Sequence, residues 1–316
     1  MQIVDHLEVT PRPPEGCVVT IGNFDGVHLG HRALISSLER EAGGIGASVA
    51  LVTFEPHTLE VVRPELAPRL LTSTARKTEL LAETGVDYLA IVTFDTERAL
   101  QPAEEFVQEI LVDRLHAREV MIGEDFHFGH GARGDIRLLE HLGKDLGFGV
   151  QPVHLVEGPD GPYSSTLIRR LVTAGDVDAA AAALGRPHEV RGTVVHGDER
   201  GRTIGFPTAN IVPGPKFCVP AVGVYAGRVR IAGDGPEPGW HDAVVNFGVR
   251  PTFRGDPDSE TRPLIEAHLF DFDADLYGCE VDVGFVARLR DERRFGGIED
   301  LRDQIAADAS EARARL

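Results

Sequence analysis

Two histidines follow a short apolar segment and a glycine-containing turn near the start of the chain, in the run VVTIGNFDGVHLGH over residues 18–31. His28 and His31 are three residues apart, so they are expected on one face of a first helical turn. Free backbone N–H groups and the positive end of the helix dipole point to the same place. Gly30 leaves room there for a ligand to approach closely. The pattern favours binding of a triphosphate, and the alternative is a capped helix with two surface histidines.

A second candidate anion site lies at residues 163–169, which read YSSTLIR. Ser164 and Thr166 place hydroxyl groups at an expected helix start, and Arg169 follows within one turn. In isolation, the hydroxyl groups would be an ordinary helix N-cap. Taken together with the two histidines, the segment predicts a second contact to the same phosphates.

A glycine-rich stretch in the second half of the chain leads into GFPTAN at residues 205–210. Gly197 and Gly205 permit a backbone-lined phosphate loop there. Thr208 and Asn210 are two residues apart, so an extended segment aims their neutral oxygens at one point. Such oxygens, together with nucleotide phosphates, suit Mg²⁺. A glycine-rich turn without a ligand is the alternative.

Glu266 lies inside an apolar segment, LIEAHLF, at residues 264–270. There a carboxylate can accept the proton of a hydroxyl group that attacks a γ-phosphate, and a surface glutamate on a strand is the alternative. No lysine stands in a GxxxxGK[ST] pattern, because the one Gly-Lys pair, at Lys144, is followed by Asp145. P-loop ATPases and GTPases are therefore excluded.

Aromatic residues and histidines occur together in the segment GEDFHFGHG. Phe126 and Phe128, beside glycines, can flank a planar ring system. His127 and His130 are possible metal ligands, but neither belongs to a recognisable metal-binding motif. His57, in the segment FEPH after another apolar run, is either a ligand contact or a loop histidine.

The chain of 316 residues carries 50 acidic and 32 basic residues, a net charge of −18. Such a surface repels nucleic acid and anionic membranes, so an anionic ligand must be held by local groups. No apolar run approaches the ~18 residues of a membrane helix, and the N-terminus lacks a secretory pattern. We therefore predict a cytoplasmic protein without membrane or nucleic-acid partners. The three cysteines form no CxxC pair, which argues against a zinc site or a disulfide scaffold.

Apolar segments alternate with amphipathic stretches up to about residue 156. The segments expected as strands are residues 17–21, 48–54, 87–94, 119–122 and 150–156. The stretches expected as helices are residues 30–42, 74–83, 103–115 and 136–146. This alternation predicts a mostly parallel sheet with helices on both faces, in which ligands bind beyond the carboxyl ends of the strands.

Two short helices are expected at residues 165–174 and 177–184, and GRP at residues 185–187 is a plausible domain boundary. Beyond it, strand-like segments are separated by loops rich in Gly, Pro and Asp, which predicts an antiparallel barrel or sandwich. These segments are residues 191–195, 223–231, 242–247, 264–270 and 280–289. A last helix is expected at about residues 298–314.

With both halves considered, the chain resembles the bacterial bifunctional riboflavin kinases/FMN adenylyltransferases (FAD synthetases) over nearly its whole length. The resemblance rests on GNFDGVHLGH, FEPH, GEDFHFG, SSTLIR, GRPHEVRG, GFPTAN, GVYAG, VNFGVRPTF, EAHLFDFDADLYG and LRDERRF, in the family's order. It implies a Rossmann-like nucleotidyltransferase domain at residues 1–185 and a six-stranded antiparallel β-barrel with a terminal helix at residues 186–316. The fold class is thus α/β plus all-β. The implied reactions are phosphorylation of riboflavin by ATP to FMN, then adenylylation of FMN by ATP to FAD with release of pyrophosphate.

The same resemblance implies roles for individual residues. At the adenylyltransferase site, ATP would be bound by Gly22, Phe24, His28, Gly30, His31, Ser164, Thr166 and Arg169. The flavin would lie against His57, Asp125, Phe126 and Phe128. In the kinase, ATP would be bound by Gly197, Gly205, Phe206, Pro207, Thr208 and Asn210. The implied catalytic residues are His28 and His31 in the first site and Glu266 in the second, where Thr208 and Asn210 would hold Mg²⁺.

Two other functions remain open from the residues alone. One is a single adenylyltransferase whose β-rich half only binds or senses flavin, and the other is a non-enzymatic flavin-binding regulator that acts through a partner. The complete set of HxGH, SSTxIR, PTAN and Glu266 favours the bifunctional enzyme, with riboflavin, FMN, FAD and ATP as its small-molecule ligands. The acidic composition argues against direct DNA binding. The oligomeric state is not predicted.

Overall fold

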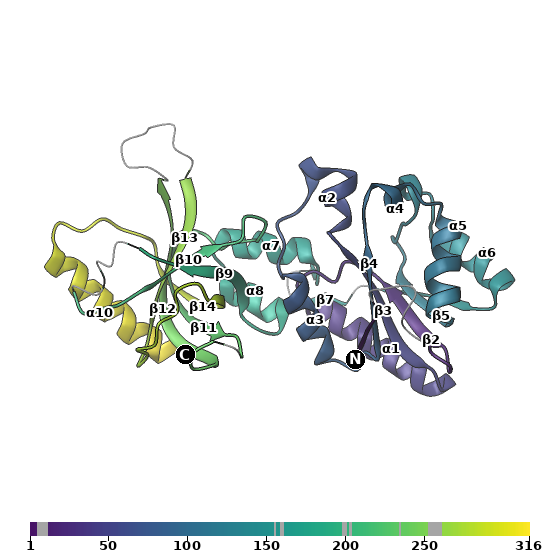
Figure 1. The fold of residues 1–316 in the computed structure, drawn as a ribbon, viewed down its shortest axis with the longest axis horizontal. Helices are drawn as coiled ribbons and strands as arrows, with labels where there is room; N and C mark the ends of the chain where they lie inside the picture. The colour runs from purple at the N-terminus through teal and green to yellow at the C-terminus, as the bar shows by residue number, and fades with distance from the viewer. Residues whose placement is uncertain are drawn as a thin grey trace. The chain divides into compact units, whose positions relative to one another are not determined.

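The structure, a computed structural model, describes residues 1–4, 12–154, 156–158, 161–197, 201, 204–233, 235–251 and 261–316. The chain forms two compact units. Unit 1 comprises Met1–Pro68 and Thr74–Ser164, and unit 2 comprises Arg69–Ser73 and Ser165–Leu316. In Figure 1 the first is a sheet flanked by helices, and the second is a barrel with a long C-terminal helix.

Unit 1 is built on a six-stranded parallel sheet with the strand order β1-β4-β3-β2-β5-β6. Its strands are β1 (Gln2–Val4), β2 (Cys17–Ile21), β3 (Ser48–Glu55), β4 (Tyr88–Thr93), β5 (Ala117–Gly123) and β6 (Gly149–Val153). The five predicted strands are confirmed. The sequence analysis missed β1, because three residues at a sheet edge carry too little pattern to identify a strand.

Helices cover both faces of this sheet (Figure 1). They are α1 (Leu29–Ile45), α2 (Thr58–Val62), α3 (Thr74–Ala82), α4 (Thr96–Leu100), α5 (Ala103–Phe106), the π-helical segment η2 (Val107–Arg114) and α6 (Ile136–Leu146). Two short 3-10 turns are η1 (Pro64–Leu66) and η3 (His130–Ala132). On one face, Val18 and Leu51 of the strands pack with Leu38 of α1 and Leu80 of α3.

The intervening strand residues point to the opposite face, as the two-residue period of a strand requires. Val19 and Val52 pack there with Ile110 of η2 and Leu139 of α6. The predicted layered α/β architecture is therefore confirmed. Because all strands are parallel, β2 and β3 end at the same edge of the sheet, where the HxGH turn follows β2 and the FEPH segment forms the end of β3 and the start of its loop.

Unit 2 contains a closed antiparallel barrel with the strand order β10-β13-β12-β11-β14-β9. Its strands are β9 (His188–Val195), β10 (Ala209–Pro213), β11 (Gly223–Ile231), β12 (Gly239–Pro251), β13 (Thr261–Leu269) and β14 (Glu280–Arg290). A short antiparallel pair, β7 (Glu157–Gly158) and β8 (Gly161–Pro162), precedes it in unit 1. The barrel alternative is confirmed over the sandwich, since β9 pairs with β10 and leaves no sheet edge.

The C-terminal helix α10 (Ile298–Arg315) lies against strands β11, β12 and β14 (Figure 1). Arg290 of β14 donates two hydrogen bonds to the Asp308 carboxylate, at 2.9 and 2.6 Å. Such a two-point pair fixes direction as well as distance, so it orients α10 on the barrel. Among the described residues, no helix is both long enough and apolar enough to cross a membrane.

Helices α7 (Ser165–Ala174) and α8 (Val177–Leu184) belong to unit 2. Helix α8 contacts β9 and β14, and its Val177 is part of the apolar core of the barrel. The units therefore divide at residue 164, ahead of the boundary at residue 185 that the sequence suggested. The division at residue 185 stays a prediction about independent folding.

We expect a fragment of residues 165–316 to resist urea better than a fragment of residues 186–316. The shorter fragment lacks α8, whose Val177, Ala180 and Leu184 are buried. Burial of one large apolar side chain is worth about 1.5–3 kcal/mol, so the free energies of unfolding should differ by at least that much. Circular dichroism during urea titration measures both values. Equal midpoints would show that the barrel does not depend on α8.

Candidate active sites

The HxGH turn begins helix α1 just after strand β2 ends. His28 is the N-cap residue, and its Nδ1 accepts a hydrogen bond from the backbone N–H of His31 at 3.3 Å. Because Nδ1 is the acceptor, the proton of a neutral His28 ring lies on Nε2, which can donate. His28 is only 4% exposed. The start of α1 thus holds a buried imidazole in one defined tautomer.

The two imidazole rings stack, with centroids 3.6 Å apart and 19° between their planes. Burial, and then the nearby His28 and Lys77, lower the pKa of His31 well below 6.5. His31 is therefore neutral at neutral pH. Its Nδ1 is buried without a hydrogen-bond partner among the described residues. A buried ring nitrogen in this state leaves a hydrogen bond available to a ligand.

Gly30 is closely packed against His28 and Tyr163. A Cβ atom at Gly30 would lie 3.1 Å from the His28 ring and 3.2 Å from Cβ of Tyr163. The preceding turn is strained, since Phe24 and Val27 have φ angles of +48° and +42°. Residues other than glycine rarely adopt this left-handed conformation, and it recurs at functional sites.

The other residues predicted to bind ATP are less constrained. A Cβ atom at Gly22 would make only ordinary van der Waals contact, at 3.4 Å. Ser164 ends unit 1, whereas Thr166 and Arg169 lie on α7 in unit 2. Arg169 Nε donates to the backbone carbonyl of Arg69 at 2.6 Å. Because the predicted phosphate contacts are divided between two units, their joint action stays a prediction.

The residues predicted to contact flavin differ in exposure. His57 is the N-cap of α2, and its Nδ1 accepts from a backbone N–H at 3.2 Å. Phe126 and Phe128 stack with ring centroids 5.7 Å apart. Phe128 belongs to the apolar core beside Phe106, while Phe126 is half-buried and Asp125 is exposed. Phe126 is thus the more accessible ring, and the flavin contacts stay a prediction.

The histidines considered as metal ligands each face a backbone carbonyl instead. His127 Nδ1 lies 2.9 Å from the carbonyl oxygen of Asp125, and His130 Nδ1 lies 3.3 Å from that of Ala99. Within the described ranges, no group of three or more His, Cys, Asp or Glu side chains is arranged to hold a metal ion. Nothing in these contacts supports a metal site at the two histidines.

On the barrel, three polar side chains form a row across neighbouring strands. Asn210 of β10 lies opposite Glu266 of β13, which in turn lies opposite Asn246 of β12. Ile265 and Ala267 belong to the core, so the row faces out of the barrel. Asn246 Nδ2 donates to Glu266 Oε2 at 3.4 Å. The barrel register thus brings together Asn210 and Glu266, which lie far apart in sequence.

The sequence analysis missed Asn246, although its position as a polar residue in the apolar run VVNF was a signal. Its Oδ1 atom is buried without a hydrogen-bond partner in the part of the chain that the structure describes. Gly197 lies directly against Asn210, because a Cβ atom at Gly197 would overlap the Asn210 side chain. Gly205 has φ +88° and open space around it. The rest of the predicted phosphate loop, residues 198–200, 202 and 203, lies outside the described residues.

His268 is a second residue that the sequence analysis missed. It is two residues beyond Glu266, so both side chains lie on the same face of β13. His268 Nδ1 donates to the backbone carbonyl of Pro207 at 2.8 Å, and its ring meets that of Phe206 at 5.3 Å. Through these contacts, β13 holds the segment that leads to Thr208.

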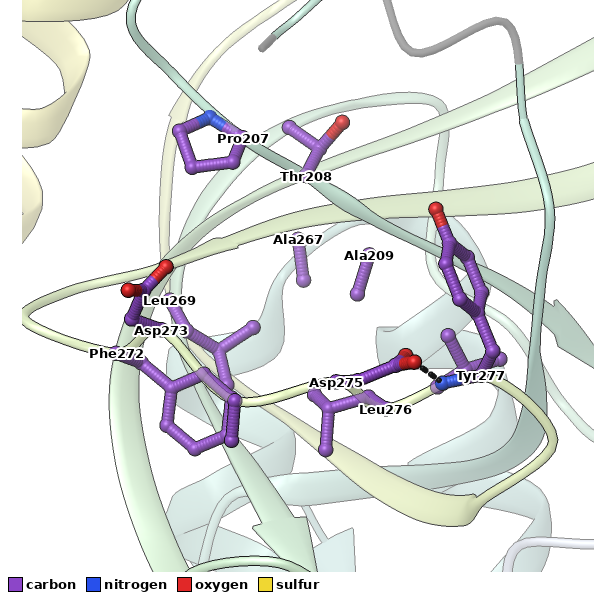
Figure 2. Close-up of a pocket in the computed structure, with 12 residues that line it drawn as sticks. Pro207, Thr208, Ala209, Ala267, Leu269, Phe272, Asp273, Asp275, Leu276 and Tyr277 are labelled. Atoms are coloured by element: carbon purple, nitrogen blue, oxygen red, sulfur yellow. Dashed lines mark hydrogen bonds between the residues drawn. The ribbon is translucent and has the colours of Figure 1, made fainter.

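A pocket of about 280 Å³ lies between the PTAN segment and the loop after β13 (Figure 2). Its lining includes Pro207, Thr208, Ala267, Phe272, Asp273 and Tyr277. The loop is ordered by a hydrogen bond from the backbone N–H of Tyr277 to Asp275 Oδ1 at 2.9 Å. The Tyr277 ring stacks on His196 at 3.7 Å. Thr208 borders this pocket and stands two residues before Asn210, whereas Ala267, which also lines the pocket, points to the face of β13 opposite Glu266.

Two family models match the chain, FAD synthetase over residues 10–167 and riboflavin kinase over residues 184–316. The bifunctional riboflavin kinase/FMN adenylyltransferase of Escherichia coli (strain K12) is 42% identical over 301 residues, which is 95% of this chain and 93% of that protein. The protein of the same name from Pseudomonas fluorescens is 41% identical over 314 residues, or 99% and 97% of the two chains.

A solved structure agrees with this result at the level of fold. It is that of a Streptococcus pneumoniae protein described as a macrolide-efflux protein, with a TM-score of 0.83 and 31% identity. The match covers 99% of this chain and 98% of that chain, so it includes both the α/β half and the barrel half. By its two family models and its relatives, the chain belongs to the family of bifunctional riboflavin kinases/FMN adenylyltransferases.

Proposed function

We propose that this chain phosphorylates riboflavin on the barrel, beside the row of Asn210, Glu266 and Asn246, and adenylylates FMN at the HxGH turn of unit 1. Membership of the family supports the two activities. The observation that carries the assignment of the kinase site is the polar row. Asn210 and Asn246 come from strands that are separated in sequence, yet the strand register places both of them opposite the Glu266 carboxylate.

In the kinase reaction, the terminal hydroxyl oxygen of riboflavin forms a bond to the γ-phosphorus of ATP. The bond from that phosphorus to the bridging oxygen breaks, and ADP leaves. Glu266 accepts the hydroxyl proton, for which a carboxylate near the attacking oxygen is suited. Asn246 donates to one carboxylate oxygen and so orients the other toward the hydroxyl group.

The pocket beside the PTAN segment is the proposed place of the nucleotide. Its volume is close to the lower end of the usual range of ligand pockets, about 300–1,000 Å³. Thr208 lines it (Figure 2), and Thr208 is the proposed link between a nucleotide seated there and Asn210, two residues further along the chain. The ring of Tyr277, stacked on His196, provides a flat apolar side to this pocket.

The oxygen atoms around Asn210 fit a magnesium ion. The Thr208 hydroxyl and the Asn210 amide are neutral oxygen ligands, and the unpartnered Oδ1 of Asn246 lies in the same row. Mg²⁺ prefers such oxygens in combination with phosphates and water. Thr208 and Asn210 would hold the ion, and the ion would neutralise charge on the phosphates of the nucleotide.

In the adenylyltransferase reaction, a phosphate oxygen of FMN forms a bond to the α-phosphorus of ATP, and pyrophosphate leaves. His28 donates from Nε2, and neutral His31 offers a second ring nitrogen, so both can hydrogen-bond to phosphate as charge shifts toward the leaving group. Ser164, Thr166 and Arg169 are the proposed further phosphate contacts. His57, Asp125, Phe126 and Phe128 are the proposed flavin contacts.

Incubation of the full chain with riboflavin, ATP and Mg²⁺, followed by chromatography, tests the whole proposal. We expect FMN to appear first and FAD to follow. An adenylyltransferase with a flavin-sensing barrel would form FAD only from supplied FMN. A flavin-binding regulator would form neither product, and either result would contradict the proposal.

We expect Asn210→Asp to change the Mg²⁺ dependence of the kinase. The variant adds a negative charge to a neutral ligand pair and places it opposite Glu266. Charge on the ligands raises affinity for the cation, so half-saturation should move to a concentration at least ~10-fold lower, with a reduced kcat. Initial rates of FMN formation against Mg²⁺ concentration measure the shift.

The control for Asn210→Asp is conversion of supplied FMN to FAD by the same preparation. That reaction takes place in the other unit, so its Mg²⁺ dependence should match the parent protein. A kinase curve that coincides with that of the parent would remove Asn210 from the proposed metal site.

A further inference from the structure

Lys77 is a buried cation that takes no part in the two proposed reactions. It is one of only three lysines in the chain and lies on α3 with 7% of its surface exposed. Its Nζ atom donates to the backbone carbonyl of Asn23 at 3.2 Å and to Thr53 Oγ1 at 3.1 Å. The Thr53 hydroxyl itself donates to the same Asn23 carbonyl at 3.2 Å. One ammonium group therefore ties α3 to the end of β3 and to the turn after β2.

The turn that Lys77 holds is the strained one that leads to the histidines. Asn23 is followed by Phe24 and then Val27, both with positive φ angles, and His28 comes next. A strained conformation persists only where its surroundings over-determine it. The Thr53 hydroxyl also donates to the backbone carbonyl of Asn23, and Asn23 Nδ2 donates a long hydrogen bond, 3.4 Å, to Thr58 Oγ1. The ammonium is thus a principal restraint on the first residues of the turn.

Two neutral hydrogen-bond acceptors do not by themselves explain a buried charge. A neutral donor would satisfy the same two oxygens without the cost of removing an ammonium group from water. Burial lowers the pKa of Lys77, and the carboxylates of Asp25 and Glu55 act against that effect. Asp25 and Glu55 favour the charged form of Lys77. The turn that leads to the histidines therefore lies next to a cation. An anionic nucleotide bound there would gain from that charge in a chain whose net charge is −18.

We propose that Lys77 is a positioning residue for FMN adenylylation, whose ammonium group holds the turn from Asn23 to His28 and supplies local positive charge for the phosphates of ATP. The inference rests on the proposed assignment of adenylyl transfer to the HxGH turn. It adds a residue from a different helix, 46 positions beyond His31 in the sequence, to that site.

The test is Lys77→Met in the full chain, with Lys77→Gln as a second variant that keeps a donor and removes the charge. Misplacement of catalytic groups by about 1 Å costs about 10²-fold in rate, so kcat/KM for FAD formation should fall by that order in Lys77→Met. Lys77→Gln should recover part of kcat, because the turn is held again, while KM for ATP stays raised. Phosphorylation of riboflavin by the same preparations should be unchanged.

A second measurement reports the charge directly. The groups that face His31 and Lys77 are His28, Asp25 and Glu55, and Lys77 is among the causes that lower the pKa of His31. The NMR titration of the His31 ring should therefore move to a higher pKa in Lys77→Met and in Lys77→Gln. If Lys77 had only a packing role, the pKa of His31 would not rise in both variants.

Lys144→Met is the matched control, because Lys144 is an exposed lysine on α6 of the same unit. It should leave both activities and the His31 titration as in the parent protein. FAD formation by Lys77→Met at the parental rate would overturn the inference. So would parental kcat and KM in Lys77→Gln together with an unchanged His31 pKa. If His31→Ala also retained FAD formation, the proposed site itself would be wrong, so the two failures are distinguishable.

Discussion

His31→Ala should reduce FAD formation from FMN and ATP by about 10²–10³-fold while FMN formation from riboflavin continues at the parental rate. The loss is of the size seen when one pre-oriented hydrogen-bond donor to developing charge is removed. His31 is suited to that task because it is neutral and stacked on His28, with Nδ1 free of protein partners among the described residues. His28→Ala should have a similar effect, with an added loss of helix stability because His28 caps α1.

Both rates should be measured on one preparation of each variant, since the kinase in the other unit then reports whether the chain is folded. His141→Ala is a matched control, because His141 lies on α6 of unit 1 with 74% of its side chain exposed. Its two activities should equal those of the parent. Loss of both activities in a folded His31→Ala protein would contradict the assignment of two separate sites.

Glu266→Gln should lower kcat for FMN formation by about 10²–10⁴-fold, with little change in the KM for ATP. An attacking hydroxyl group needs an acceptor for its proton, and an amide of the same shape cannot take it. The nucleotide contacts proposed for Thr208 and the pocket are left intact, which is why binding should persist. Conversion of supplied FMN to FAD should be unaffected.

Glu280→Gln is the matched control for Glu266→Gln. Glu280 is an exposed glutamate at the start of barrel strand β14, and it faces Thr193 of β9 in the strand register. The same substitution there should leave FMN formation at the parental rate. If Glu266→Gln formed FMN as fast as the parent protein, Glu266 would not be the base.

Much of the fold could be predicted from local patterns. Strand β2 and helix α1 are marked by an apolar run, a glycine-containing turn and the HxGH start, and all of these are features of neighbouring residues. The same holds for β11 and α10, whose predicted ranges agree with the observed ones to within a residue. Strand β1 was missed because it is held by pairing with β4, more than 80 residues away.

The candidate sites show the same division. Residue type and spacing within short segments were enough to identify four candidate site residues: His28, His31, Asn210 and Glu266. Asn246 stands out in the sequence only as a polar residue in an apolar run, and its place opposite Glu266 is visible only in the strand register. The grouping of α8 with the barrel likewise depends on which apolar face buries Val177.

The sequence by itself determined the α/β fold of the first half, the β-barrel fold of the second half and the family. It also identified His28, His31, Asn210 and Glu266, on which the main predictions rest. Only the tertiary structure decided that Asn246 donates to Glu266, that His268 donates to Pro207 in the PTAN segment, and that Lys77 donates to the turn before the histidines. The reason is physical. Helical and strand periods act over a few residues and can be read locally, whereas strand register and the packing of a helix on a sheet join residues tens of positions apart.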